Sequence, residues 1–292
     1  MGLGGANTAN AGVIASGAYA VASNNVTNLL VTTSGGATFT FGPTSAVSSA
    51  SAELNGAGEA SSAAGLNPDV KPANAPGSAP FIRMNNTFTR FGVKSSDYAN
   101  ADANAGGQKA LGDPITHASD IAEINLANPG FADADGRNRS FTPFTVAGLG
   151  GVMGFTFDAD PYMEIILVGS TPTASATMVF RIIITDGTGT TVFSWSPNGI
   201  PLAAASDTGV KEVTDSGDLN HQCSANCLYS PGLTSYAANT NAGVLSAGSY
   251  TLFVLMPETV SASVPEPGTI ALMGIGLLGL FGAASPRRNK QG

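Results

Sequence analysis

Hydrophobic and polar residues alternate along several short segments of the chain, which is the pattern of strands that bury one face. The clearest of these segments are rich in aromatic and β-branched residues: 140–148 (SFTPFTVAG), 152–159 (VMGFTFDA), 162–170 (YMEIILVGS), 176–186 (ATMVFRIIITD), 190–197 (TTVFSWSP) and 246–258 (SAGSYTLFVLMPE). The DGTG sequence at 186–189 has the composition of a hairpin turn, because glycine accepts a positive φ at little cost. Short strands at regular spacing predict a mainly β fold, a jelly-roll-like β-sandwich.

The first eighty residues are rich in Ala, Ser, Gly and Asn, and short β-like pieces occur at 12–22, 26–34 and 37–41. Residues 45–80 combine small side chains with four prolines, which predicts a long loop with partial helix. Residues 85–93 (NNTFTRFGV) alternate as a strand would. Residues 117–127 (HASDIAEINLA) fit either a short amphipathic helix or a strand with its Ala/Ser face toward solvent.

The last part of the chain has a different pattern. Residues 267–286 contain no charged side chain, and the basic residues Arg287, Arg288 and Lys290 follow at once. Twenty helical residues span about 30 Å, close to the hydrocarbon thickness of a bilayer. A basic cluster beside such a span favours the cytoplasmic side. The pattern predicts a C-terminal transmembrane helix with the body outside the cytoplasm.

Pro265 and Pro267 flank Glu266 just before this run. Proline disfavours helix in the preceding residue, so an extended segment is expected here, accessible to a processing enzyme. We therefore divide the chain into a low-complexity part with short strands that packs on the sandwich (1–80), a β-sandwich body (81–260) and a terminal tag (261–292).

The order VPEPGT, apolar run and PRR resembles the PEP-CTERM sorting signal of exported Gram-negative proteins. The resemblance implies that Pro265, Glu266 and Pro267 are recognised by exosortase, a membrane-embedded processing enzyme. It also implies that 269–284 are a transient membrane anchor and that Arg287 and Arg288 stop translocation. Proteins of this class are anchored in the inner membrane before processing, reach the cell surface or extracellular space, and accompany exopolysaccharide, biofilm and floc formation.

Charged residues are only 11% of the chain, and the net charge is −8. Because the tag carries three basic residues, the body is more acidic than the whole chain, which argues against nucleic acid or an anionic membrane surface as its partner. Hydroxyl and amide side chains in place of charges are typical of exported bacterial surface proteins. The first twenty residues lack the basic and apolar regions of a signal peptide, so we expect an upstream leader.

Three groups of residues are candidates for a disulfide, a calcium site or a sugar-binding site. Cys223 and Cys227 lie four positions apart in HQCSANC, and in an oxidising compartment such a pair closes a small disulfide loop. Asp133 and Asp135 in DADG resemble the start of a calcium loop, although Phe144 stands where an EF-hand has its glutamate, and solvated turn aspartates are the simpler interpretation. Trp195 is a candidate sugar-stacking platform or, alternatively, a core residue.

No nucleophile elbow, phosphate loop or dinucleotide fingerprint occurs in the sequence, so we expect a protein that is not an enzyme and needs no cofactor, with calcium as the open exception. The leading hypothesis is an exported protein of the cell surface or extracellular matrix. The alternative is a carbohydrate- or calcium-dependent ligand-binding module on the cell surface.

Overall fold

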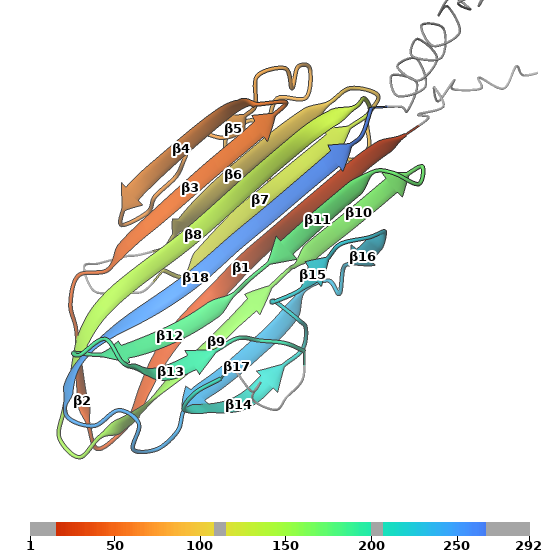
Figure 1. Cartoon of the computed structure of the whole chain (residues 1–292). Helices are drawn as coiled ribbons and strands as arrows, with labels where there is room; N and C mark the ends of the chain where they lie inside the picture. The colour runs from red at the N-terminus through yellow and green to blue at the C-terminus, as the bar shows by residue number, and fades with distance from the viewer. Residues whose placement is uncertain (1–15, 108–114, 200–206, 267–292) are drawn as a thin grey trace, which may run out of the picture.

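The computed structural model of the chain describes residues 16–107, 115–199 and 207–266. These residues form two antiparallel sheets that lie face to face in an elongated body (Figure 1). The prediction of a mainly β fold is confirmed. The expected transmembrane helix falls outside the described residues.

The first sheet is built around a long strand with partners on both sides. Its members are β14 (Val210–Asp215), β17 (Thr234–Thr240), β9 (Gly151–Ala159), β1 (Gly17–Gly35), β7 (His117–Leu126), β6 (Tyr98–Gly106) and β5 (Ala73–Asn74) in spatial order, with β10 (Tyr162–Val168) on β1 and β16 (Cys227–Tyr229) on β10.

The second sheet has two long strands at its centre. Its members are β13 (Thr191–Trp195), β12 (Arg181–Asp186), β18 (Gly248–Val264), β8 (Gly130–Ala147), β3 (Ser45–Leu54) and β4 (Ala57–Gly65) in spatial order, with β11 (Thr173–Met178) on β18, β15 (Gln222–Cys223) on β11 and β2 (Thr38–Phe41) on β8.

Each sheet contains a long strand that pairs along one edge with two shorter strands in line. In the first sheet, β1 pairs with β10 through its first part and with β9 through its second part. In the second sheet, β18 pairs with β12 and then with β11 along one edge, and with β8 along its whole length on the other. These long strands place residues distant in sequence along one continuous core.

Residues 45–65 correct the expectation of a loop with partial helix, because they form strands β3 and β4. In β3 the serines and alanines alternate, so that Ala46, Ala50 and Ala52 are buried in the core. A small apolar side chain at every second position is enough to bury one face of a strand when the opposite sheet comes close. Residues 117–126 are also a strand, β7, but neither of its faces is open to solvent over most of its length.

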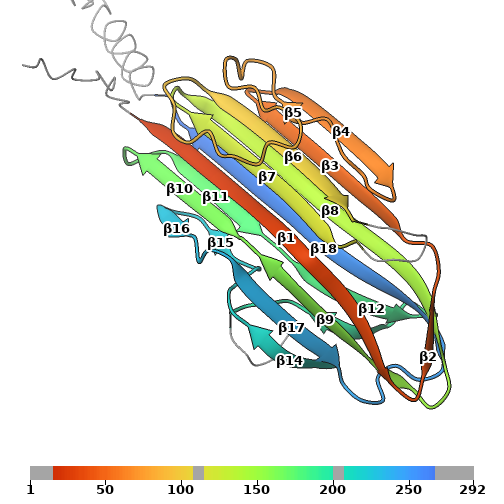
Figure 2. The same cartoon turned by 180° about the vertical axis from the view of Figure 1, so that it is seen from behind.

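Residues 85–93 are irregular, so the strand expected there is wrong. This segment belongs to the long connection between β5 and β6, which crosses the outer face of β6 and β7 (Figure 2). Phe88 and Phe91 pack there against a small buried cluster that contains Tyr19 and Tyr98. The alternation of apolar residues therefore reflects packing of a loop onto a sheet.

The core between the sheets has two chemically different halves. The alanine half contains most of the buried alanines of β1, β3, β6 and β7, together with Met163, Ile165 and Val260. The aromatic half contains phenylalanines from β8, β9 and β13 with Trp195, Tyr236 and Tyr250.

A polar layer separates the two halves, with one polar side chain from each of five strands. Its members are Asn24 on β1, Ser48 on β3, Asp120 on β7, Asn138 on β8 and Glu258 on β18. Asn138 Nδ2 donates to the carbonyl oxygen of Ser119 in the opposite sheet at 2.9 Å, and Ser48 Oγ donates to Asn138 Oδ1 at 2.5 Å. The layer therefore links the two sheets by hydrogen bonds.

Candidate functional site

The candidate functional site lies at the end of β18, the last strand of the body. Strand β18 remains paired with β8 up to its last residue, Val264, which lies opposite Gly130 and is buried. Pro265 and Glu266 follow and are exposed. The ladder ends at Val264, directly before the first proline of the motif. Pro267, the expected anchor at 269–284 and the basic residues Arg287 and Arg288 lie outside the described residues.

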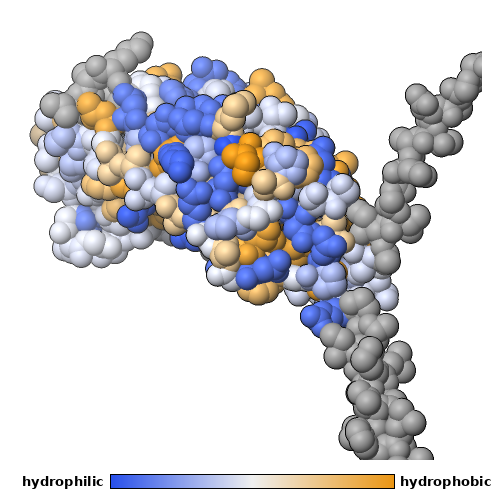
Figure 3. All heavy atoms as spheres, turned by 90° about the horizontal axis from the view of Figure 1, so that it is seen from above, coloured by the Kyte–Doolittle hydropathy of each residue, from blue (hydrophilic) through white to orange (hydrophobic). Residues whose placement is uncertain are grey.

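The start of β1 and the end of β18 lie at the same end of the sandwich (Figure 1). Gly17 is paired with Val168, and Ser263 is paired with Thr173 and Phe131. This is the end of the alanine half. Seen from above, hydrophilic and hydrophobic residues are interspersed over the face in view (Figure 3). Pro265 and Glu266 form a short exposed segment directly after the last residue of β18.

Within residues 16–107, 115–199 and 207–266, no helix is both long and apolar enough to cross a membrane.

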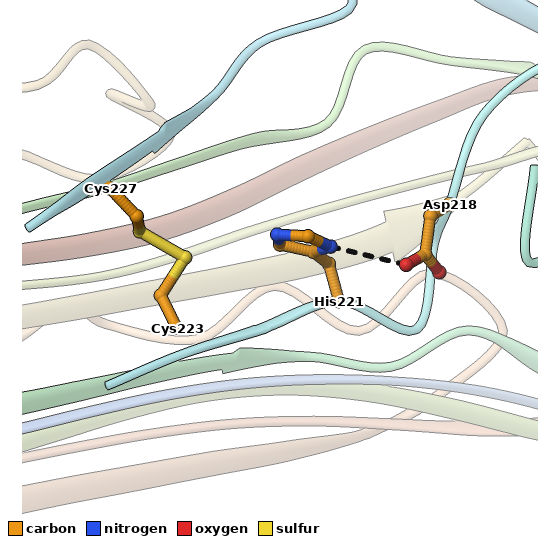
Figure 4. Close-up of a disulfide and its surroundings, with 4 residues drawn as sticks. All are labelled: Asp218, His221, Cys223 and Cys227. Carbon is orange, nitrogen blue, oxygen red and sulfur yellow. Dashed lines mark hydrogen bonds and ion pairs between the residues drawn. A yellow bond between two sulfur atoms is a disulfide. The ribbon is translucent and has the colours of Figure 1, made fainter. Parts of the chain in front are cut away.

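The structure joins Cys223 and Cys227 by a disulfide (Figure 4). Cys223 ends β15, which belongs to the second sheet, and Cys227 begins β16, which belongs to the first sheet. The disulfide therefore braces more than a local loop, because it ties the edges of the two sheets together. The sequence gives the spacing of the pair but not this placement, which depends on the pairing of β15 with β11 and of β16 with β10.

His221 lies beside the disulfide but has other partners. Its Nδ1 is 3.1 Å from Asp218 Oδ2, and its ring stacks on Tyr229 with 4.4 Å between the centroids. No group of three or more His, Cys, Asp or Glu side chains in the described part of the chain is arranged to hold a metal ion.

Asp133 and Asp135 lie near the start of strand β8, so the turn expected around them is wrong. Their side chains are on the outer face of the second sheet, where Asp135 accepts hydrogen bonds from the Arg137 guanidinium at 2.6–2.8 Å. They line a groove of about 550 Å³ together with Glu53, Glu59 and hydroxyl side chains. Partial burial and then the neighbouring Glu53 raise the pKa of Asp133.

Trp195 is completely buried at the end of β13, which excludes an exposed sugar-stacking platform. Its ring packs near Phe157, with 5.7 Å between the centroids, and its Nε1–H donates to Glu212 Oε1 at 2.7 Å. Trp195 is therefore a core residue of the aromatic half, and its indole N–H is satisfied by the hydrogen bond to Glu212, as is usual for a buried tryptophan.

Sequence reasoning missed a buried polar cluster on the outer face of the first sheet. Glu123 on β7 accepts hydrogen bonds from Tyr19, Tyr98 and Arg83 and from the backbone N–H groups of Phe91 and Gly92. The ion pair with Arg83 has an Nη2–Oε2 distance of 2.5 Å, and both side chains are buried. Burial lowers the pKa of Arg83, and the charge of Glu123 opposes that shift.

This cluster fixes the connection between β5 and β6 on the sheet, because Arg83 Nη1 also donates to the carbonyl oxygens of Thr87 and Thr89. The fixed connection carries Arg90, whose guanidinium lies 3.2 Å from the centroid of the Tyr162 ring. Arg90 and Tyr162 line a groove of about 410 Å³ with Ser23, Asn25, Ser119 and other residues. The sequence signal for this arrangement was a single glutamate, Glu123, within the mostly apolar segment 121–127.

The described residues form a β body whose last strand, β18, ends directly before Pro265. Residues 263–288 match the family model described as PEP-CTERM protein-sorting motif, so the chain carries this sorting motif. The motif implies export and processing by exosortase, a membrane enzyme. Comparisons with curated proteins and with solved structures found no match to the chain.

Proposed function

We propose that this chain is an exported, non-enzymatic protein of the cell surface or extracellular matrix that functions with exopolysaccharide in biofilm or floc formation. Exosortase removes its tag after a stage in which residues 269–284 anchor it in the inner membrane. The body is a jelly-roll-like sandwich that acts as a stable, charge-poor module. The observation that carries this proposal is the sorting motif at 263–288, which begins in the last two residues of β18.

The position of the motif supports access by a processing enzyme. Val264 is buried in the ladder, whereas Pro265 and Glu266 are exposed. An enzyme that recognises the motif therefore meets Pro265 and Glu266 outside the ladder, without having to unfold the sandwich. The tag carries three basic residues and one acidic residue, so its removal leaves a body more negative than the −8 of the whole chain, which keeps the body off anionic lipid surfaces.

The test is replacement of Pro265, Glu266 and Pro267 by alanine in the full chain, expressed in a host that contains exosortase. We expect the parent chain to yield a shorter extracellular species and the variant to remain a full-length membrane species, as judged by fractionation and intact mass. Pro129→Ala is the matched control, because Pro129 is an exposed proline in the β7–β8 turn at the same end of the body. Normal maturation of the triple variant contradicts the proposal.

A second candidate function is binding of a carbohydrate, favoured by the groove on the first sheet. Hydroxyl and amide side chains such as Ser23, Asn25 and Ser119 face a groove that also contains Arg90 and Tyr162. Retention of the body on a polysaccharide column, reduced by Asn25→Ala together with Arg90→Ala, would favour this function. A calcium-dependent form of this function would use the other groove, on the second sheet, which contains Asp133 and Asp135. It predicts a melting temperature that calcium raises in the parent chain but not in Asp133→Asn.

A further inference from the structure

Two carboxyl groups lie between the sheets with no exposure to solvent, Asp120 on β7 and Glu258 on β18. None of their four oxygen atoms accepts a hydrogen bond from a side-chain amide, a hydroxyl or a cationic group. The side-chain amide of Asn24, the cross-strand neighbour of Asp120, is also buried without a partner. Buried polar groups in folded proteins are almost always paired, so this part of the polar layer needs an explanation.

The topology brings the two carboxyl groups together. Asp120 and Glu258 face the core from opposite sheets, and each is the other's only side-chain hydrogen-bond partner, with the backbone N–H of Asn24 also acting on Asp120. Glu258 lies opposite Gly136 in the β18–β8 ladder. A Cβ atom on Gly136 would lie 3.0 Å from the carbonyl oxygens of Asp102 and Ile121 and 3.2 Å from Asp120 Cβ. The glycine therefore allows the close approach of the sheets that the carboxyl pair requires.

No positive charge compensates the pair among the described neighbours. The groups that face it are uncharged: Asn24 on β1, Ser48 on β3, Asn138 on β8 and Met178 on β11. A further charge that acts on the pair is that of Asp135 on β8, which is negative and is held on the outer face by Arg137. Two buried carboxylates without a counter-ion are strongly unfavourable, whereas two carboxyls that share a proton satisfy each other.

The pKa values of both carboxyl groups are shifted upward. Burial, and then the neighbouring Glu258, raise the pKa of Asp120 well above its usual range. Burial also raises the pKa of Glu258, and the hydrogen bond that it accepts from Asp120 opposes part of that shift. Both shifts favour a pair that holds one proton between its two carboxyl groups.

We propose that Asp120 and Glu258 share a proton in the folded body, so that a carboxyl–carboxyl hydrogen bond joins the two sheets and weakens as the surroundings become alkaline. In the unfolded chain both groups have ordinary pKa values of about 4. Between that pH and the raised pKa, the folded chain binds more protons than the unfolded chain. The free energy of unfolding contributed by the pair is therefore largest below about pH 4 and falls as the pH rises through this window.

The test is chemical unfolding of the full chain in mild detergent from about pH 5 to about pH 9, compared with the Asp120→Asn/Glu258→Gln double variant. For the parent we expect the unfolding equilibrium constant to rise by about tenfold to a hundredfold more across this range than for the double variant. The matched control is Glu53→Gln/Asp160→Asn, which removes two exposed carboxylates of the body. The control should keep the pH dependence of the parent. If the unfolding free energy changes with pH equally in the parent and the double variant, the proposal is overturned.

Infrared spectroscopy of the folded full chain tests the proton directly, even if the double variant does not fold. We expect the band of a protonated carboxyl group near neutral pH, and Glu258→Gln or Asp120→Asn alone should alter it. Absence of the band overturns the proposal. A melting temperature that calcium chloride raises and EDTA lowers in the parent, but not in the double variant, also overturns it, because a metal ion would then replace the proton.

Discussion

The alanine half and the aromatic half of the core use opposite ways of filling the space between the same two sheets. In the aromatic half, large rings such as Phe157, Phe180 and Tyr236 interdigitate with 4.6–4.8 Å between centroids. In the alanine half, small side chains such as those of Ala101 and Ala122 predominate, and the backbones of β3 and β6 in opposite sheets come close. Close packing is achieved in both, by interlocking side chains in one case and by close approach of backbones in the other. The two halves should therefore fail in different ways when their volumes are changed.

Loss of volume should be most harmful in the aromatic half. Phe157→Ala removes the ring that contacts Phe180, Trp195 and Tyr236, and we expect it to cost about 3–5 kcal/mol of unfolding free energy. Chemical denaturation at fixed pH measures the change. Val213→Ala is the control, because this side chain is 57% exposed and its truncation should change stability by no more than about 0.5 kcal/mol. Equal effects of the two substitutions would refute the packing described for this half.

Gain of volume should be most harmful in the alanine half. Ala101 lies opposite Ala122 on β7 and Ala73 on β5, and it is completely buried. Ala101→Leu must separate backbones, and we expect a loss of about 1–3 kcal/mol by the same denaturation measurement. Ala64→Leu adds the same volume at an exposed position of β4 and should be nearly neutral. A neutral Ala101→Leu variant would mean that the sheets are not closely packed there.

Removal of the disulfide tests how the edges of the two sheets are held together. Cys223→Ser/Cys227→Ser removes the covalent link between β15 and β16, and we expect a loss of about 2 kcal/mol. The parent chain under reducing conditions is the matched comparison and should lose the same amount. If neither change affects denaturation, the pairing of β10 with β16 and of β11 with β15 holds this edge without the disulfide.

The smallest effect on stability is expected at the sorting motif. Pro265 follows the last ladder residue and is exposed, so Pro265→Ala should change the unfolding free energy by less than about 0.5 kcal/mol. Val264→Ala, one residue earlier, removes a buried side chain from the alanine half and should be destabilising by about 1–2 kcal/mol in the same assay. A large loss of stability in Pro265→Ala would place the motif inside the folded body.

The sequence predicted the strands whose side chains are large and alternate with polar residues. The segments at 152–159, 162–170 and 190–197 correspond to β9, β10 and β13, and the turn at 186–189 joins β12 to β13 with Gly189 at φ 86°. Such segments have one apolar face in any context, so their pattern alone specifies a strand. The sorting motif is equally local, because a processing enzyme recognises it as a short linear sequence, and the sequence alone was sufficient to find it.

Only the tertiary structure determined the conformation of the Ala/Ser segments and the surroundings of isolated polar residues. Residues 45–65 have too little apolar volume to specify a strand, and β3 and β4 form because neighbouring strands provide their ladders and the opposite sheet covers Ala50 and Ala52. Trp195, Asp120 and Glu258 likewise carry no sequence signal of their environment. Their burial and their partners depend on contacts between strands far apart in the chain, which local composition does not encode.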